Sequence, residues 1–447
     1  MSNKRIIVIG AGASGMMAAG KAAEAEAKVL LLEKMERPCK KILISGQTRC
    51  NVTNSKELDD FIITMGPNGR FLYGAFHHYF RDDLLAFLKR YGVETKTEAD
   101  GRIFPASDNA GDVTNALREY TADHKVQLIT DIRATGIKVE GIQVTGVQTD
   151  KGAYPAAAVI LATGGASYPG TGSSGDGYKI AAALGHTLVR LRPSLVPLIV
   201  HETELVKSMQ GVSLHDVRLT AYKCQARDIN NYPAQTGDCG RGTGHGHPPH
   251  PIIASRRGDI IFAHFGISGP LTLQTSLAIV DAMENGPVSV SIDIKPEANE
   301  KELDQQLQQE FDQHGKRSYR HILDDLLPHK MVQPFAKLTG IPQEKRANQL
   351  SAQERKRLVN SLKSLCFTIK GHLPLDSAMV TAGGVSLDEV DPRTMASRLI
   401  KGLYFCGEVL DLDGDTGGYN LQAAFSTGYV AGEQAATFIH TAHPQNM

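Results

Sequence analysis

The stretch RIIVIGAGASGMMAAGKAAEAEAKVLLLEK, residues 5–34, decides the fold. It opens with an apolar, β-branched run, Arg5–Ile9, that is typical of a buried parallel strand. Gly10, Gly12 and Gly15 follow directly in G-x-G-x-x-G spacing, and an alanine-rich helical stretch begins there. Glycines at these places allow a tight turn, the approach of a pyrophosphate to the backbone, and close packing of the helix on the strand. The free N–H groups at the start of the helix can then bind the phosphates.

A second apolar run, Val29–Leu32, ends at the acidic residue Glu33. A carboxylate at this place accepts hydrogen bonds from a ribose 2′-hydroxyl and repels a 2′-phosphate. Strand, glycine turn, helix, strand and acidic residue together predict a site for NAD or FAD. A glycine-rich turn without a ligand is the alternative.

Composition excludes several classes of protein. The chain has 447 residues, enough for two or three domains, and its 48 Lys and Arg balance its 48 Asp and Glu. A net charge of zero disfavours nucleic acid or an acidic membrane as the main partner. There is no run of 18 apolar residues and no leader pattern, so we expect a cytoplasmic protein that does not enter membranes. The six cysteines form no C-x-x-C pair, which favours reduced thiols.

A second glycine-rich turn near the C-terminus favours FAD over NAD alone. The apolar run LYFCGE ends at Gly407 and Glu408, and Gly417 and Gly418 open a helix of small residues. FAD is longer than one strand–helix–strand unit can cover, and the N-terminus of a second helix can stabilise negative charge on the reduced flavin. The segment ATGG, residues 162–165, ends another strand where the backbone could pass close to the cofactor.

The pattern of apolar, charged and turn-forming residues along the chain also predicts its domains. Residues 1–193 and 371–447 alternate strand and helix, residues 194–295 with about 360–370 are rich in β-type runs, and residues 296–359 are charged and helical. We therefore predict an α/β fold: a discontinuous Rossmann-like FAD-binding domain with an inserted β-barrel domain and an inserted helical domain. Three short runs are expected to form an antiparallel meander: 125–132, 134–141 and 142–150.

Five stretches are distinctive: LISGQTRCNVTN, GRIFPAS, ATGGASYPGTGSSGDGY, FAHFGISGP and GLYFCGEVLDLDGDTGGYNLQAAFSTG. In them the chain resembles the HI0933-like flavoprotein family, which includes aminoacetone oxidases and proposed reductases of bile-acid intermediates. The resemblance spans nearly the whole chain and implies an FAD domain with β-barrel and helical insertions. The family usually has Gly-Gly-Gly-Arg-Cys-Asn where this chain has Gly46-Gln47-Thr48-Arg49-Cys50-Asn51. Gln47 and Thr48 add bulk beside the expected flavin, so the substrate of a relative does not transfer directly.

The motifs and the resemblance together give the residues expected to bind FAD. They are Gly10, Gly12, Ser14, Gly15, Glu33, Lys34, Lys41, Ser45, Gly46, Arg49, Asn51, Ala134, Ala162, Thr163, Gly164, Gly407, Glu408, Gly417, Gly418, Tyr419, Asn420 and Leu421.

Flavin chemistry also needs a group that manages a proton. The candidates for catalysis are His264, in FAHFG, and Tyr419, beside the second glycine turn. Each has a plain alternative, since His264 could hold a loop and Tyr419 could pack on the ring edge. Gly170, Gly172 and Gly175 also fit the fingerprint spacing, but no strand leads directly into them. We expect this loop to line the flavin, with NADH or NADPH at most a transient co-substrate.

The histidine-rich segment 228–250 offers Cys and His at spacings that match no structural zinc pattern, so we predict a loop there and no metal. The sequence thus predicts an FAD-dependent oxidoreductase that acts on a small molecule, as an oxidase or as a reductase fed by NAD(P)H. A flavin-dependent RNA-modifying protein is the alternative. The sequence does not indicate an oligomeric state.

Overall fold

A computed structural model describes residues 5–231, 237–240 and 251–441. The chain forms two compact units: the first comprises the chain up to Ser194 and from Leu375 onward, and the second comprises Leu195–Pro374. The finer division into three domains stays a prediction. Within the described ranges, no helix combines the length and apolar character needed to cross a bilayer.

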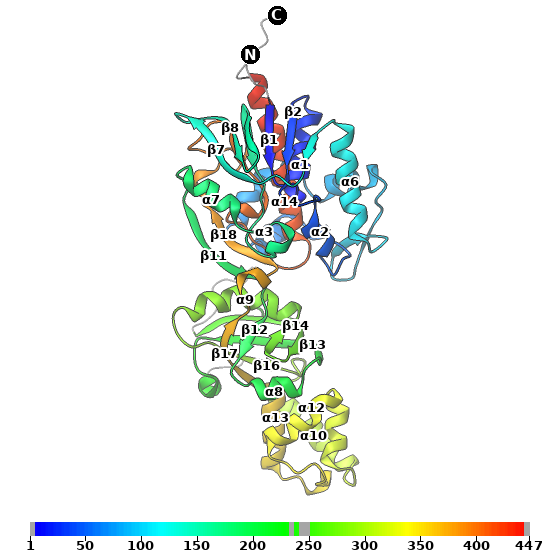
Figure 1. Ribbon diagram of the computed structural model, residues 1–447. Coiled ribbons are helices and arrows are strands. Elements are labelled where there is room, and N and C mark those ends of the chain that lie inside the picture. Colours follow the sequence, from blue (N-terminus) through cyan, green and yellow to red (C-terminus); the bar gives the residue numbers. More distant parts are fainter. Residues whose placement is uncertain (1–4, 232–236, 241–250, 442–447) are drawn as a thin grey trace, which may run out of the picture. The chain divides into compact units, whose positions relative to one another are not determined.

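The first unit is built on a five-stranded parallel sheet (Figure 1) with the order β19-β10-β1-β2-β6. Its strands are β1 Arg5–Ile9, β2 Lys28–Leu32, β6 Gln127–Ile129, β10 Ala158–Leu161 and β19 Leu403–Phe405. Ile9 is in register with Leu32 on one side and Leu161 on the other, and Leu161 is in register with Phe405. Because these pairs are parallel, their carboxyl ends meet at one edge of the sheet, where such folds bind their ligands.

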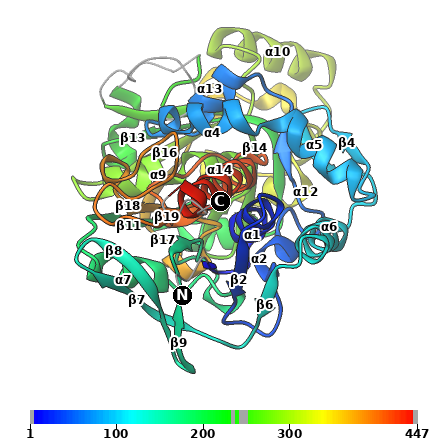
Figure 2. The same ribbon diagram turned by 90° about the horizontal axis from the view of Figure 1, so that it is seen from above.

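Helices α1 (Ala13–Glu24) and α14 (Tyr419–Thr441) lie side by side (Figure 2). A Cβ on Gly428 would lie 2.3 Å from a carbonyl oxygen of α1, so glycine permits this close approach. A Cβ on Gly15 would lie 1.8 Å from the carbonyl oxygen of Gly10. The third glycine of the fingerprint therefore serves the packing of α1 on the end of β1.

An antiparallel meander of β7 (Ala134–Glu140), β8 (Gln143–Thr149) and β9 (Gly152–Pro155) flanks the sheet. The expectation that the run 125–132 joins this meander is wrong, because its strand β6 pairs in parallel with β2. A helix, α6 (Ala110–Asp123), directly precedes β6, and a helical crossover favours parallel pairing. The other elements of this unit are β3 Thr53–Asn54, β4 Thr95–Thr97, β5 Arg102–Pro105, β11 Leu188–Ser194, β18 Val380–Val385, α2 Lys40–Ile44, α3 Leu58–Thr64, α4 Tyr73–His78, α5 Arg81–Arg90 and α7 Asp176–Ala183.

The second unit contains a closed barrel with the strand order β12-β15-β14-β13-β16-β17, which confirms the predicted β-barrel. Its strands are β12 Leu198–Val200, β13 Ser213–Tyr222, β14 Ile252–Ala263, β15 Gly266–Ser268, β16 Ser289–Asp293 and β17 Leu365–His372. Its helices are α8 Thr203–Ser208, α9 Pro270–Met283, α10 Glu300–Gln313, α11 Tyr319–Leu326, α12 His329–Thr339 and α13 Ala352–Lys363. Side chains of the barrel and of the helices share one hydrophobic cluster, which includes Phe335 and Phe367.

Candidate functional site

The glycine turn after β1 leaves open space above its second glycine. Gly10 has φ +100°, and a Cβ there would lie 2.6 Å from the carbonyl oxygen of Ala162, so only glycine fits. A Cβ on Gly12 would meet nothing within 4 Å. Gly12 precedes the first turn of α1, whose N–H groups have no intrahelical partners. The Ser14 hydroxyl donates to the carbonyl of Cys406 at 3.4 Å, which joins this helix to the end of β19. An open cradle at a helix N-terminus fits a pyrophosphate.

Glu33 follows β2 and is 8% exposed. One carboxylate oxygen accepts the N–H of Ala11 at 2.7 Å, and the other accepts the N–H of Met35 at 2.9 Å. A carboxylate has about four lone-pair sites, so both oxygens can also accept ribose hydroxyls. The position of Glu33 fits the ribose-binding role predicted for it.

Lys34 points to the start of α7. Its Nζ lies 2.9 Å from Asp176 Oδ2 and 2.5 Å from Ser174 Oγ. Asp176 Oδ1 accepts a second bond, at 2.5 Å, from Arg133, which precedes the buried Ala134 at the start of β7. The sequence indicated Lys34 and Ala134, but not Asp176 or Arg133, because nothing in local spacing joins residues so far apart along the chain.

A second polar cluster lies at the end of β19. Lys41 Nζ lies 2.8 Å from Glu408 Oε2 and 2.8 Å from Ser167 Oγ. Glu408 Oε1 accepts the N–H of Thr381 at 2.9 Å and the Ser167 hydroxyl at 3.2 Å. The structure thus brings the predicted Lys41 and Glu408 together. It adds Ser167, within the distinctive stretch after ATGG, and Thr381, for which the sequence held no signal.

The loop after α2 has an unusual backbone. Gly46, Gln47, Thr48 and Cys50 all have left-handed φ angles, from +56° to +68°. Such angles cost a side-chain-bearing residue about 1–2 kcal/mol, and a β-branched residue such as Thr48 adopts them least readily. Glycine adopts such angles freely, so Gln47 and Thr48 hold this loop shape with strain. Ser45, before the loop, donates from its hydroxyl to the carbonyl of Ile42 at 2.7 Å.

Arg49, in the same loop, is held by protein groups on three sides. Its Nη2 lies 2.5 Å from Glu98 Oε1, and its Nε lies 2.8 Å from Asp108 Oδ1. The guanidinium also lies 4.0 Å from the centre of the Phe104 ring. These contacts favour a loop-holding role for Arg49, and its predicted contact with FAD stays a prediction.

The glycine turn before α14 is fixed to β3. In the amide orientation that satisfies its hydrogen bonds, Asn51 accepts the N–H of Gly418 at 3.0 Å and donates to the carbonyl of Thr53 at 2.9 Å. Gly418 has φ +93°, and a Cβ there would lie 2.4 Å from that same carbonyl oxygen. Asn420 closes the turn, because its Oδ1 accepts the N–H of Gly414 at 2.8 Å. The first N–H groups of α14 therefore have a defined position.

The two catalytic candidates belong to different units. Tyr419 is 4% exposed, its ring centre lies 4.6 Å from that of Phe61, and burial raises the pKa of its hydroxyl to about 12. Leu421 is partly buried against the same core. His264 lies in the exposed turn between β14 and β15, with its ring centre 5.0 Å from that of Phe265.

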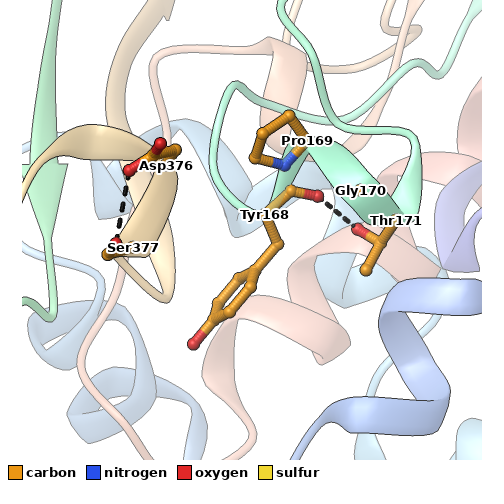
Figure 3. A pocket seen from close by; sticks show the side chains of 6 residues that line it. All are labelled: Tyr168, Pro169, Gly170, Thr171, Asp376 and Ser377. Atoms are coloured by element: carbon orange, nitrogen blue, oxygen red, sulfur yellow. Dashed lines mark hydrogen bonds between the residues drawn. The ribbon is translucent and has the colours of Figure 1, made fainter.

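The glycine-rich loop 170–175 lies against the Glu33 end of the site. A Cβ on Gly172 would lie 3.7 Å from Glu33 Oε1 and 3.2 Å from Met35 Cγ. Beside this loop is an open cavity of about 450 Å³ (Figure 3). Its lining residues are Tyr168, Pro169, Gly170, Thr171, Asp376 and Ser377. Thr163 and Gly164 join this loop to β10.

Among the described residues, no cluster of His, Cys, Asp and Glu side chains is arranged to hold a metal ion. Most of the histidine-rich segment 228–250 lies outside those residues. The prediction that this segment binds no metal therefore stays a prediction.

Comparison with known proteins gives the family. The model of the HI0933-like protein Rossmann domain matches residues 4–434. The chain belongs to the HI0933-like family. It is 33% identical to the 3-dehydro-bile acid delta(4,6)-reductase of Clostridium scindens, over 97% of this chain and 99% of that protein. It is 29% identical to the ribosomal RNA dihydrouridine synthase of Escherichia coli, over 96% of each.

Solved structures agree on the fold. A point variant of E. coli quinol fumarate reductase FrdA superposes with a TM-score of 0.50 at 19% identity, covering 100% of this chain and 72% of that one. Family and fold together make this chain an FAD-dependent oxidoreductase. The open cradle above Gly12, the carboxylate of Glu33 and the defined start of α14 fit the two ends of FAD.

Proposed function

We propose that this chain uses FAD to reduce a carbon–carbon double bond conjugated with a carbonyl group. The reactions named for two relatives of this chain support the proposal. A 3-dehydro-bile acid delta(4,6)-reductase acts on double bonds conjugated with a 3-oxo group, and dihydrouridine is uridine whose ring double bond, conjugated with a carbonyl, has been reduced. Two different carbon skeletons thus share one type of reacting group, and the family membership supports the same chemistry here.

FAD in this site would supply a hydride to the carbon β to the carbonyl, while a proton is added at the α carbon. The chain must provide that proton. Tyr419 stays our first candidate, because burial raises its pKa to about 12 and so keeps its hydroxyl protonated at neutral pH. A hydroxyl of this kind gives its proton only to a strong base, such as an enolate. His264, an exposed side chain of the second unit, is the second candidate.

The residues predicted to bind the cofactor are proposed in the same roles. Gly12 and the first turn of α1 would hold the pyrophosphate, and Glu33 the ribose. Lys41 and Glu408 would lie along the ribityl chain, and the start of α14 would face the flavin. NADH or NADPH would deliver the electrons transiently, because the glycines at 170–175, which match the fingerprint spacing, do not directly follow a strand: β10 ends at Leu161.

The test is turnover of the full-length protein with NADH or NADPH under anaerobic conditions. The substrates are a 4,6-dien-3-one bile acid and a simple enone, each analysed by mass spectrometry. The proposal expects a product heavier by two hydrogens, and deuterium at the β carbon when the nicotinamide carries deuteride. A product that has lost hydrogen, with formation of peroxide from oxygen, would instead establish an oxidase.

An RNA substrate is the second candidate, because two relatives at 29% and 30% identity are ribosomal RNA dihydrouridine synthases. Although the whole chain is neutral, residues 314–363 carry eleven Lys and Arg against four Asp and Glu. Among them, Lys316, Arg320 and Arg346 are exposed, and a backbone bridge between Ser318 and Arg346 holds the two segments side by side. Such a basic surface fits a phosphate backbone. Salt-dependent binding of ribosomal RNA that weakens when these three cations become glutamine would favour this candidate.

A further inference from the structure

Three segments that are distant in the sequence meet around Glu33. The first is the end of β2, with Lys34. The second leads into β7: the N–H of Ile132 donates to the carbonyl of Glu33 at 3.0 Å, and Arg133 follows. The third is the glycine-rich loop before α7, which approaches Glu33 at Gly172. If FAD binds as proposed, these segments surround its adenosine half.

Asp176 directly follows the third segment, and its carboxylate bonds to the other two. It accepts from Lys34 Nζ at 2.9 Å and from Arg133 Nη2 at 2.5 Å, and it begins the helix that follows the loop. Its side chain is 10% exposed, against 22% for Lys34 and 53% for Arg133. Ser174, within the loop, accepts from the same Lys34 at 2.5 Å. A single carboxylate therefore links the loop to both strands.

The charge of this group is secured by its partners. Burial by itself would raise the pKa of Asp176, but hydrogen bonds from Arg133 and Lys34 outweigh burial and lower it to about 2. The carboxylate is therefore ionised throughout the neutral and mildly acidic range. Without it, Lys34 and Arg133 would place two positive charges near each other beside Glu33, and the loop would lose both of its bonds to the strands at Asp176.

We propose that Asp176 is a positioning residue that closes the adenosine end of the FAD site by holding the 170–175 loop against Glu33. The inference rests on the FAD site proposed above. Asp176 need not touch the cofactor: it acts through Lys34 and Arg133. Its loss should speed the release of FAD and leave the flavin end of the site unchanged.

The experiment compares Asp176→Asn with the full-length holoprotein. FAD release is followed as the rise of flavin fluorescence after dilution, and the flavin reduction potential is measured in parallel. We expect FAD release to be about tenfold faster or more, which corresponds to a barrier to release lowered by about 1.4 kcal/mol. The flavin reduction potential should be unchanged. Asp176→Glu, which keeps the charge, should restore much of the retention.

Glu354→Gln is the matched control. Glu354 accepts from Lys345 at 2.7 Å in the second unit, and hydrogen bonds from that lysine lower its pKa to about 2 as well. The Glu354→Gln variant should lower the stability of the second unit without changing the rate of FAD release.

Equal release rates in Asp176→Asn, Glu354→Gln and the unmodified protein would overturn the proposal. If Asp176→Asn does not fold, Arg133→Met, at a half-exposed side chain, takes its place under the same criteria. A protein that retains FAD through Asp176 but reduces no alkene would contradict the proposed function alone.

Discussion

Glu33 is the residue whose chemistry we expect to select among the dinucleotides. Its two oxygens are fixed by the N–H groups of Ala11 and Met35, one on the glycine turn and one just after β2. A carboxylate held in this way favours free ribose hydroxyls over a phosphorylated ribose. The same bonds attach the first glycine turn to the end of β2, so Glu33 also shapes the site in which we propose that it binds the ribose.

Glu33→Ala should therefore weaken FAD binding, because it removes a charged acceptor from the ribose and a partner from Ala11. The expected loss is on the order of 1.5–3 kcal/mol of binding free energy. Titration of the apoprotein with FAD measures it. Glu140→Ala, which removes an exposed carboxylate from the meander, is the control. Identical FAD affinity in Glu33→Ala and Glu140→Ala would mean that Glu33 does not bind the ribose.

At the scale of elements, the start of α14 is held by a hydrogen bond to the segment that leads into β3. Asn51 binds the N–H of Gly418 and the carbonyl of Thr53, so the helix begins at a fixed place beside β3. The dipole of a helix that begins here would stabilise negative charge on a reduced flavin and so raise its reduction potential.

Gly418→Val tests this placement. A Cβ at Gly418 would lie 2.4 Å from the carbonyl oxygen of Thr53, and the φ of +93° is strained for valine, so the helix start must move. We expect loss of FAD or a potential lowered by tens of millivolts, since the dipole contributes about 0.3–2 kcal/mol and 30 mV corresponds to about 1.4 kcal/mol. Anaerobic dye titration measures the potential. Gly371→Val, in β17 of the second unit and with nothing within 4 Å of the new Cβ, is the control. Full FAD content at an unaltered potential would place α14 away from the flavin.

At the scale of the whole molecule, the chain leaves the first unit after Ser194 and returns to it at Leu375. Strands β11 and β18 pair antiparallel there, with Ser194 opposite Val380. The two ends of the insertion are therefore close, and the first unit has its own hydrophobic cluster, built around β1, α1 and α14.

A chain in which a short Gly-Ser linker joins Ser194 to Leu375 should fold and bind FAD. The reason is that every residue proposed to bind the cofactor lies in the first unit. Flavin content per chain and a thermal melt measure the outcome. A chain that is folded but free of flavin would mean that the second unit supplies part of the FAD site.

Local spacing accounts for what the sequence predicted well. The strand, glycines and acid of residues 5–34 are close along the chain, and the β-barrel follows from a dense series of β-type runs. The features that the sequence did not predict depend on contacts between residues that are distant along the chain. The Lys34–Asp176 pair spans 142 positions, and the Ser167–Glu408 pair spans 241. The short run at β6 carries no pattern that separates a parallel edge strand from a meander strand, so its neighbour α6 decided the pairing.

The most direct test of the account is the reaction of the reduced holoprotein with a conjugated enone in the absence of oxygen. The flavin is reduced photochemically, mixed with the enone in a stopped-flow instrument, and followed by its visible absorbance. The account predicts that the oxidised yellow spectrum returns and that one saturated product forms per flavin. A flavin that stays reduced with enones and with uridine-containing ribosomal RNA, and turns yellow only when oxygen is admitted, would contradict it.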